Sequence, residues 1–208
     1  KDALGLMFNH SFLKSLNLPM ESAMAKVWNE KLFKHIRQGA DAASVKLAKE
    51  RGACEDAAEA GMMARFSHKM AVAPTASISI ICGGTSAGIE PIPANVYTHK
   101  TLSGSFTVKN KYLEQALEQK GQNTDEVWTS ILEHEGSVQH LDCLDEHEKS
   151  TFKTAFEIDQ RWIIEHAADR TPYICQAQSL NVFLPADINK WDLHMLHWTA
   201  WERGVKSL

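Results

Sequence analysis

The amino-acid sequence predicts an α/β fold, in which long helices alternate with short apolar strands that run parallel. Apolar residues recur every three or four positions over long stretches, which is typical of one face of a helix. Short apolar runs bounded by Pro, Gly or Asn separate these stretches, as buried strands would. Helices that connect strands favour a parallel sheet, so we treat residues 1–208 as a single segment of this class.

The first expected element is a long amphipathic helix that ends before Gly52, a residue well suited to follow a helix. A short apolar run at 70–73 then predicts a buried strand, and Pro74 directly after it predicts a turn. Residues 83–95 are rich in Gly, Pro and Ser, which favours a loop. The expected buried face of the helix comprises Met24, Trp28, Leu32, Ile36, Ala40, Ala43 and Leu47.

Two further helices are expected at 111–121 and 124–134, with Asn123 as the cap of the second and Glu126 in the capping-box position. Asp145 and Glu148 repeat the capping-box pattern before a longer helix. The inner face of that longer helix is expected to hold Phe152, Phe156, Ile163 and Ala167.

The last third of the chain predicts a strand, a helix and the start of another strand. Alternating apolar residues at 180–184 indicate the first strand. A helix then opens at 185–187 and ends at Gly204, and core spacing predicts that Trp191, Met195 and Trp198 pack inward. Because a strand needs neighbours, residues 205–208 suggest an excerpt or one part of a split protein.

Charge and cysteine content narrow the classes of function. The formal net charge is −4 and the pI is near 6.2, which argues against nucleic-acid binding. No apolar run approaches the roughly 20 residues of a membrane helix, and no signal peptide is visible.

The four cysteines form no C-x-x-C pair, so we expect reduced thiols in a cytoplasmic protein, although a disulfide pattern stays open. These are Cys54, Cys82, Cys143 and Cys175.

Small hydroxyl residues follow the expected strand at 70–73, and they are the best candidates for a binding site. A helix that starts there would present free backbone N–H groups, to which Thr75 and Ser77 would add hydroxyl donors. Such donors suit an anion, and phosphate is the usual occupant. The alternative is an ordinary helix cap, with Thr75 as the capping residue. The candidate phosphate-binding residues are Pro74, Thr75, Ala76, Ser77 and Ile78, with Ser79 a weaker candidate.

One cluster has the spacing of metal ligands, and it stays an alternative. His140, Cys143 and His147 follow one another at intervals compatible with zinc, and His134 precedes them. Acidic residues surround the cluster, which favours a solvated acidic face instead. A nucleotide P-loop is excluded, because no Lys-Ser or Lys-Thr follows the glycines of the 83–88 loop.

The string APTASISIICGGTSAGIEPIPANVY, residues 73–97, resembles the signature of ribonucleotide reductase large subunits, and in particular those of class I. In that family a Pro-Thr-Ala-Ser-like turn precedes a Gly/Ser loop and then Ile-Glu-Pro. The resemblance extends over nearly the whole chain in one order, which makes it specific. Further matching segments are 21–26, 46–52, 158–160, 178–183 and 204–208.

The resemblance implies the later portion of a ten-stranded α/β barrel and the reduction of ribonucleoside diphosphates by radical chemistry. It assigns the substrate phosphates to the turn at 74–78, and Glu90 and Pro91 to the mouth of the barrel. It implies no catalytic residue, metal or bound cofactor in this segment. The radical would come from a metal-containing small subunit, and ATP or dNTP effectors would bind elsewhere in the large subunit. The expected partners are the remainder of the large subunit, the small subunit and the diphosphate substrate, with no nucleic acid or membrane.

The absence of several family motifs matters equally. No Asn-x-Cys-x-Glu occurs, and none of the four cysteines lies in a matching motif, so the chain is expected to be inactive alone. The segment at 3–10 is shorter than the glycine-rich segment of the family. Two alternatives stay open: a cobalamin-dependent ribonucleotide reductase, and a non-catalytic phosphate-binding or assembly module that retains the fold.

Overall fold

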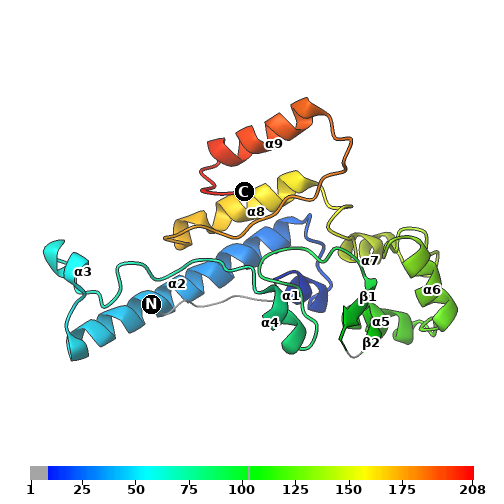
Figure 1. Ribbon diagram of the computed structural model, residues 1–208, viewed down its shortest axis with the longest axis horizontal. Coiled ribbons are helices and arrows are strands. Elements are labelled where there is room, and N and C mark those ends of the chain that lie inside the picture. The colour runs from blue at the N-terminus through cyan, green and yellow to red at the C-terminus, as the bar shows by residue number, and fades with distance from the viewer. Residues whose placement is uncertain (1–8, 103) are drawn as a thin grey trace.

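The computed structural model describes residues 9–102 and 104–208, so the shortened segment at 3–10 lies largely outside the described residues. Helices make up most of the regular secondary structure, and one two-stranded sheet accompanies them (Figure 1). The α-helices are α1 (Asn9–Ser15), α2 (Ala23–Arg51), α3 (Glu55–Glu59), α4 (Ala76–Ile81), α5 (Lys111–Gln119), α6 (Asp125–Glu133), α7 (Glu146–Thr151), α8 (Gln160–Arg170) and α9 (Lys190–Glu202). A 3₁₀ turn, η1 (Thr171–Tyr173), follows α8, and the strands are β1 (Val96–Thr101) and β2 (Gly104–Lys109).

The long helix α2 is confirmed, with Gly52 directly after it, but its buried face differs from the prediction. The side chain of Ser22 caps the helix by accepting a hydrogen bond from the N–H of Ala25 at 3.2 Å. Met24 is 52% exposed and Trp28 is 38% exposed, so the centre of the buried face lies one position further along the chain than predicted. Ile36 and Ala40 of the expected face are partly buried and do pack against the core. The buried residues are Ala25, Asn29, Phe33, Ser44 and Ala48.

Two polar residues in that buried stripe explain the error, because the prediction followed apolar residues alone. The Asn29 side chain donates to the backbone oxygen of His166 at 2.9 Å and accepts from Arg170 at 3.1 Å. The Ser44 hydroxyl accepts from the N–H of Arg65 at 3.0 Å. Buried polar groups are tolerated when their hydrogen bonds are made, so these residues face the core.

The expected parallel pairing is present as a short ladder between 70–72 and 176–179. The residues Val72 and Gln178 form a parallel bridge, and the Met70 carbonyl accepts from the N–H of Gln176 at 3.0 Å. The expected strand at 70–73 is present only as this ladder, and the expected strand at 180–184 does not form. Pro74 has no N–H with which to continue the ladder, and the Phe183 N–H donates to a side-chain oxygen on α8 at 2.7 Å.

Residues 205–208 also form no strand, contrary to the prediction. Their side chains attach to the ladder segment instead. The Lys206 Nζ donates to the carbonyls of Ile174 and Cys175, both at 3.0 Å, and the Ser207 hydroxyl donates to the carbonyl of Gln178 at 2.9 Å. The chain after α9 is therefore fixed to the ladder by side chains and not by a strand.

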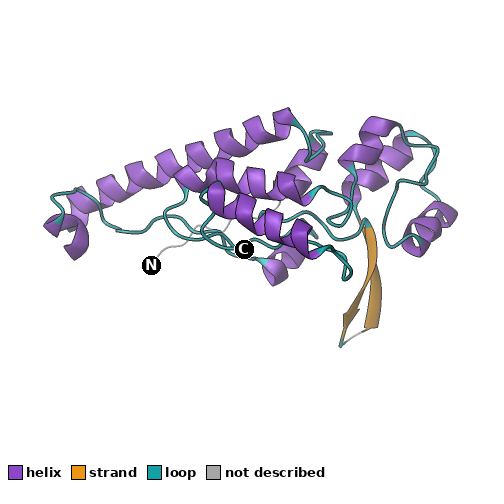
Figure 2. Cartoon of the chain, turned by 90° about the horizontal axis from the view of Figure 1, so that it is seen from above, coloured by secondary structure: helices purple, strands orange, loops and turns teal. Residues whose placement is uncertain are grey.

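An antiparallel hairpin of β1 and β2 was not predicted, and it projects from the body of the molecule (Figure 2). Its register pairs Val96 with Lys109 and Thr101 with Gly104. The signal was present, because β-branched and aromatic residues at 96–98 and 106–108 flank a Leu-Ser-Gly turn sequence.

The helices α5, α6 and α7 pack beside the hairpin around one core. The cap of α6 is Thr124, whose hydroxyl accepts from the N–H of Val127 at 3.4 Å, so Asn123 was the wrong choice. Asn123 accepts instead from the indole N–H of Trp128 at 2.7 Å. The core contains Val96, Leu113, Leu117, Trp128, Ile131, Val138, Leu141, Leu144 and Phe152.

The capping box of Asp145 and Glu148 is confirmed, but the longer helix expected after it is two helices, α7 and α8. The break follows from the chain at 152–159. The Thr154 N–H donates to a Glu157 side-chain oxygen at 2.7 Å, and Asp159 caps a new helix. Phe152, Ile163 and Ala167 are buried as expected, whereas Phe156 is 63% exposed because it lies in this break.

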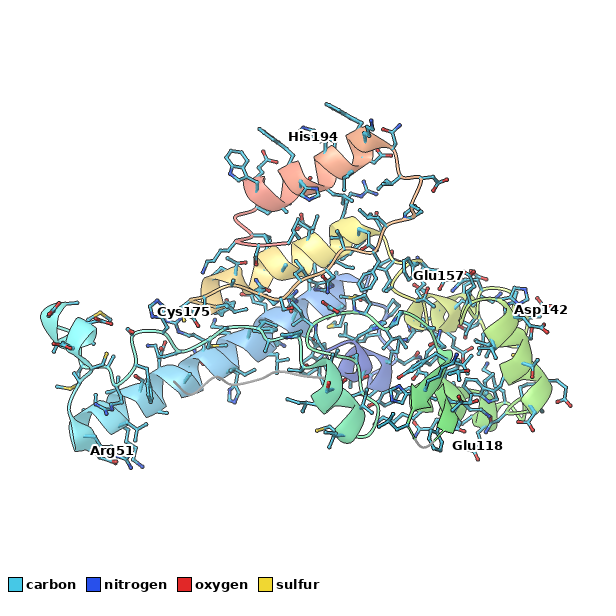
Figure 3. The ribbon with its side chains drawn as sticks, viewed as in Figure 1. Arg51, Glu118, Asp142, Glu157, Cys175 and His194 are labelled. Atoms are coloured by element: carbon cyan, nitrogen blue, oxygen red, sulfur yellow. The ribbon has the colours of Figure 1, made fainter. Side chains whose placement is uncertain are left out.

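The helix α8 lies between α2 and α9 (Figure 1). The carboxylate of Glu165 pairs with Lys26 on α2 at 3.0 Å and with Arg203 after α9 at 2.8 Å. Contrary to the prediction, the tryptophans of α9 do not pack inward: Trp191 is 65% exposed, and Ala200 is the buried residue of this helix. Aromatic side chains stand on the side of α9 away from α8, near the labelled His194 (Figure 3).

Among the described residues, no helix combines the length and apolar character required to cross a bilayer.

A second core lies between α1, α2, α8 and the ladder. It contains Leu13, Met20, Ala25, Phe33, Met70, Val72, Ile89, Ile158, Ile163, Ala167, Ile174 and Leu180.

His166, at the edge of this core, should make stability depend on pH. Its ring is 1% exposed, its Nε2 lies 2.8 Å from the Met20 carbonyl, and burial lowers its pKa to about 4. The unfolded pKa lies near 6.5, so the unfolded state binds more protons between these values, and stability falls as pH falls. We expect the free energy of unfolding to fall by about 2 kcal/mol between pH 7 and pH 5 because of this group. The figure follows from the difference between its folded and unfolded pKa values.

Urea unfolding at the two pH values, with the wild type and His166→Gln compared, measures this contribution. Glutamine can still donate to the Met20 carbonyl, and every other group titrates in both proteins. Equal pH dependence in the two proteins would contradict the assignment to His166.

Candidate functional site

The turn at 74–78 lies at the surface, directly after the ladder residue Val72. Thr75 adopts a left-handed conformation with φ 51° and ψ 25°, which is uncommon for a residue with a side chain. It precedes α4, whose first backbone N–H groups have no acceptor within the helix. Pro74, Ala76, Ser77 and Ile78 are exposed, so a ligand can reach the turn.

The hydroxyl groups of the turn have different environments. Thr75 is only 9% exposed, and its Oγ1 accepts a hydrogen bond from the N–H of Gly88 at 2.8 Å. Ser77 is exposed on the first turn of α4. Ser79 is 4% exposed and its hydroxyl donates to the Ala76 carbonyl at 2.7 Å, so it faces the helix. Of the three, the Ser77 hydroxyl is the most accessible to a ligand.

The loop at 84–90 packs against the turn at 74–78 and holds it in place. Gly88 has φ +47°, and a Cβ on it would lie 3.1 Å from the Ala73 carbonyl oxygen. This close approach favours glycine at position 88. Ser86 and Ser11 exchange two hydrogen bonds between each hydroxyl and the other residue's N–H, at 2.9 and 3.0 Å. The loop therefore connects α1 to the turn.

Replacing Thr75 with Val should detach the turn from this loop, since it removes the acceptor and leaves the Gly88 N–H buried without a partner. A cost of roughly 1–3 kcal/mol in the free energy of unfolding is expected. Thr75→Ser retains the hydroxyl and serves as the matched control. Denaturant unfolding of the three proteins tests this, and a Val variant as stable as the Ser variant would contradict it.

Glu90 connects the Ile-Glu-Pro element to the segment around the ladder. Its carboxylate accepts a hydrogen bond from the Asn181 side chain at 2.6 Å. Burial raises the pKa of Glu90, and the hydrogen bonds from Asn181 oppose that shift. Two segments that share the family resemblance are thereby in direct contact, and the pairing of Glu90 with Asn181 was not predicted.

A cavity of about 350 Å³ opens between α4, the 84–95 loop and the base of the hairpin. Its volume is in the range of small-molecule sites, roughly 300–1,000 Å³. The turn at 74–78 reaches it through Ala76. Polar and aromatic side chains in its wall include Ser79, Ser86, Glu90, Asn95, Tyr97 and Phe183.

The histidines and the cysteine with metal-ligand spacing do not converge. The rings of His134 and His140 stack with centroids 3.7 Å apart, and the Nε2 of His140 lies 2.8 Å from the Ser130 hydroxyl. The ring of His147 points elsewhere, to the carbonyl of Asn17 at 2.8 Å. Within 9–102 and 104–208, no group of three or more His, Cys, Asp or Glu residues could hold a metal ion.

The four cysteines lie on separate parts of the chain, and all are free thiols. Cys82 is exposed at the end of α4. Cys175 lies beside the ladder (Figure 3), where its sulfur accepts hydrogen bonds from the N–H groups of Lys69 and Met70, both at 3.1 Å. None of these positions brings a thiol pair together.

Helices packed around a parallel ladder, with an accessible turn at its end, are the arrangement of part of an α/β barrel. The sequence matches the family described as "Ribonucleotide reductase, barrel domain" over residues 2–62 and 55–208. The large subunit of ribonucleoside-diphosphate reductase from Invertebrate iridescent virus 6 is 48% identical over 209 residues, covering 99% of this chain and 22% of the relative. The large subunit from Invertebrate iridescent virus 3 is 41% identical over 208 residues, covering 99% and 33%.

The solved structures include a similar chain, the Actinobacillus ureae class Id ribonucleotide reductase alpha subunit. The TM-score is 0.91 with 38% sequence identity, over 98% of this chain and 37% of that one. The protein belongs to the ribonucleotide reductase barrel-domain family. It spans about a fifth to a third of the length of these curated large subunits.

Proposed function

We propose that the chain forms the later portion of the catalytic barrel of a class I ribonucleoside-diphosphate reductase, and that the turn at 74–78 binds the substrate diphosphate. The observation that supports this most directly is the exposure of Pro74, Ala76, Ser77 and Ile78 in the segment that resembles the family signature. The relatives are large subunits of ribonucleoside-diphosphate reductase and a class Id alpha subunit, which supports class I over a cobalamin-dependent enzyme.

In this proposal the turn acts by binding and orientation. The first N–H groups of α4 and the hydroxyl of Ser77 donate to phosphate oxygens, and hydrogen bonds to a charged acceptor are the stronger kind. Thr75 contributes a fixed backbone, because its side chain is held by Gly88. The ring chemistry of the nucleotide takes place on residues supplied by the rest of the large subunit.

The partners follow from the same proposal. The rest of the large subunit completes the barrel and carries the catalytic cysteines and the sites for ATP or dNTP effectors. A metal-containing small subunit supplies the radical, and the complex acts in the cytoplasm. This segment holds neither metal nor cofactor of its own.

A chimera tests the proposal. Residues 1–208 would replace the matching segment of the Actinobacillus ureae class Id alpha subunit, and deoxynucleotide formation would be measured with the cognate small subunit. We expect product above the level of the small subunit alone. A folded chimera that binds diphosphate and the small subunit but forms no product would instead favour a non-catalytic binding module.

A further inference from the structure

Lys14 on α1 is a buried basic residue that makes no ion pair within 4 Å among the described residues. It is 4% exposed, and its Nζ donates to the side-chain oxygen of Asn95 at 3.3 Å. That oxygen already accepts a shorter bond, 2.8 Å, from the side chain of Asn110. An ammonium group has three donors, so this environment leaves Lys14 poorly satisfied. A buried charge in this state is costly unless an anion balances it.

The pKa of Lys14 agrees with this geometry. Burial lowers the pKa to about 7, although the charge of Glu157 opposes that shift. The ring of Phe152 lies 5.6 Å from the Nζ, a weak interaction compared with an ion pair. An anion beside the Nζ would favour the charged form and raise the pKa again.

A cavity of about 180 Å³ opens beside Lys14, between α1, α5 and α7. It is too small for a nucleotide, since sites for molecules of that size have roughly 300–1,000 Å³. Hydrogen-bonding side chains form one wall, because Tyr112, Gln115 and Gln119 lie on one face of α5 at helical spacing. The phenol and the two amides can donate to an oxyanion.

One carboxylate also lines this cavity, but its charge is balanced. The Oε2 of Glu148 accepts from the Nζ of Lys120 at 3.0 Å and from the N–H of Asp145 at 2.8 Å. Among the described residues that line this cavity, Lys14 is therefore the cation without an ion pair, and the charge of Glu157 acts on it from outside the lining.

We propose that this cavity binds a small oxyanion of the size of inorganic phosphate or acetate, with Lys14 as its cation and the α5 side chains as additional donors. The site is distinct from the turn at 74–78. It does not depend on the proposed reductase activity.

Thermal unfolding of the 208-residue protein tests the proposal, with phosphate, acetate and chloride compared at equal ionic strength so that screening is constant. Phosphate should raise the Tm of the wild type above its value in chloride, because a ligand that binds the folded state stabilises it. Lys14→Met should remove the part of this gain that comes from the cavity, whereas the exposed Lys34→Met should retain the full gain. Acetate shows whether planar carboxylates also bind.

Two additional measurements keep the test independent of the stability of Lys14→Met. Gln115→Glu places a carboxylate in the cavity wall while Lys14 stays, and it should remove the same part of the gain in phosphate. NMR titration of the Lys14 side chain should show a higher pKa in phosphate than in chloride. Ser77→Pro distinguishes phosphate binding at the turn 74–78 from binding in the cavity. In this variant the part of the gain that depends on Lys14 should persist.

The proposal is overturned if phosphate gives the wild type no gain over chloride, or if Lys14→Met and Gln115→Glu both retain the full gain. An unchanged pKa of Lys14 in phosphate would overturn it equally.

Discussion

Ser77→Pro should weaken binding of a ribonucleoside diphosphate roughly ten- to a hundredfold, since one hydrogen bond to a charged group contributes roughly 1.5–3 kcal/mol. Ser77 is the second residue of α4, and proline is tolerated in the first turn of a helix because its missing N–H has no intrahelical partner. The substitution therefore removes a donor from the turn with little effect on the fold.

Calorimetric titration of a diphosphate into the chimeric large subunit measures this effect. Ser77→Ala is the matched control, because it removes the hydroxyl and retains the N–H, and its loss should be smaller. Unfolding curves establish that the variants stay folded. If the Pro variant binds as tightly as the wild type, the backbone of the turn does not hold the phosphates.

Gly136→Ala should be the most destabilising of the Gly→Ala substitutions at glycines within residues 9–102 and 104–208. A Cβ on Gly136 would lie 2.4 Å from the Cβ of Ala94 and 2.9 Å from the backbone nitrogen of Asn95, in addition to a positive φ of +84°. Strain at positive φ costs roughly 1–2 kcal/mol, and overpacking adds typically 1–3 kcal/mol. We expect a loss of about 2–5 kcal/mol in the free energy of unfolding.

Gly52→Ala is the matched control, because Gly52 has nearly the same φ, +83°, and no atom within 4 Å of the position of a Cβ. Urea unfolding of both variants separates the cost of the backbone conformation from the cost of the contact. Equal losses would show that the 134–138 turn moves freely away from Ala94, contrary to the packing described here.

The sequence predicted helix ends and caps correctly where residues close in sequence determine them. The stop of α2 at Gly52 and the capping box of Asp145 and Glu148 depend on residues close in sequence, and both are confirmed. The break between α7 and α8 depends in addition on contacts with distant segments, such as the bond from the Ala155 N–H to the Ile92 carbonyl at 2.8 Å. Periodicity cannot reveal such contacts.

The buried face of α2 was misjudged for a related reason. Asn29 and Ser44 face the core because partners from α8 and from residues after α3 satisfy them, and neither partner is visible in the helix sequence. The exposed tryptophans of α9 show the opposite case, in which apolar spacing does not imply burial.

For the candidate site, the contiguous turn at 74–78 could be proposed from the sequence, because its residues are neighbours in the chain. The residues that fix it were missed. Gly88 and Asn181 come from other segments, and only the fold brings them to Thr75 and Glu90. The glycine in a Ser/Gly loop was a usable signal, since loops that approach another backbone closely favour this residue.

The side chain of Asn95 joins distant parts of the molecule. Its amide nitrogen donates to the carbonyls of Gly136 at 3.0 Å and Phe152 at 2.7 Å, while its oxygen accepts from Lys14 and Asn110. The hairpin base, α5 and α7 therefore share one anchor with α1. Slow hydrogen exchange should consequently extend through both cores together, and heat should melt them in a single cooperative transition.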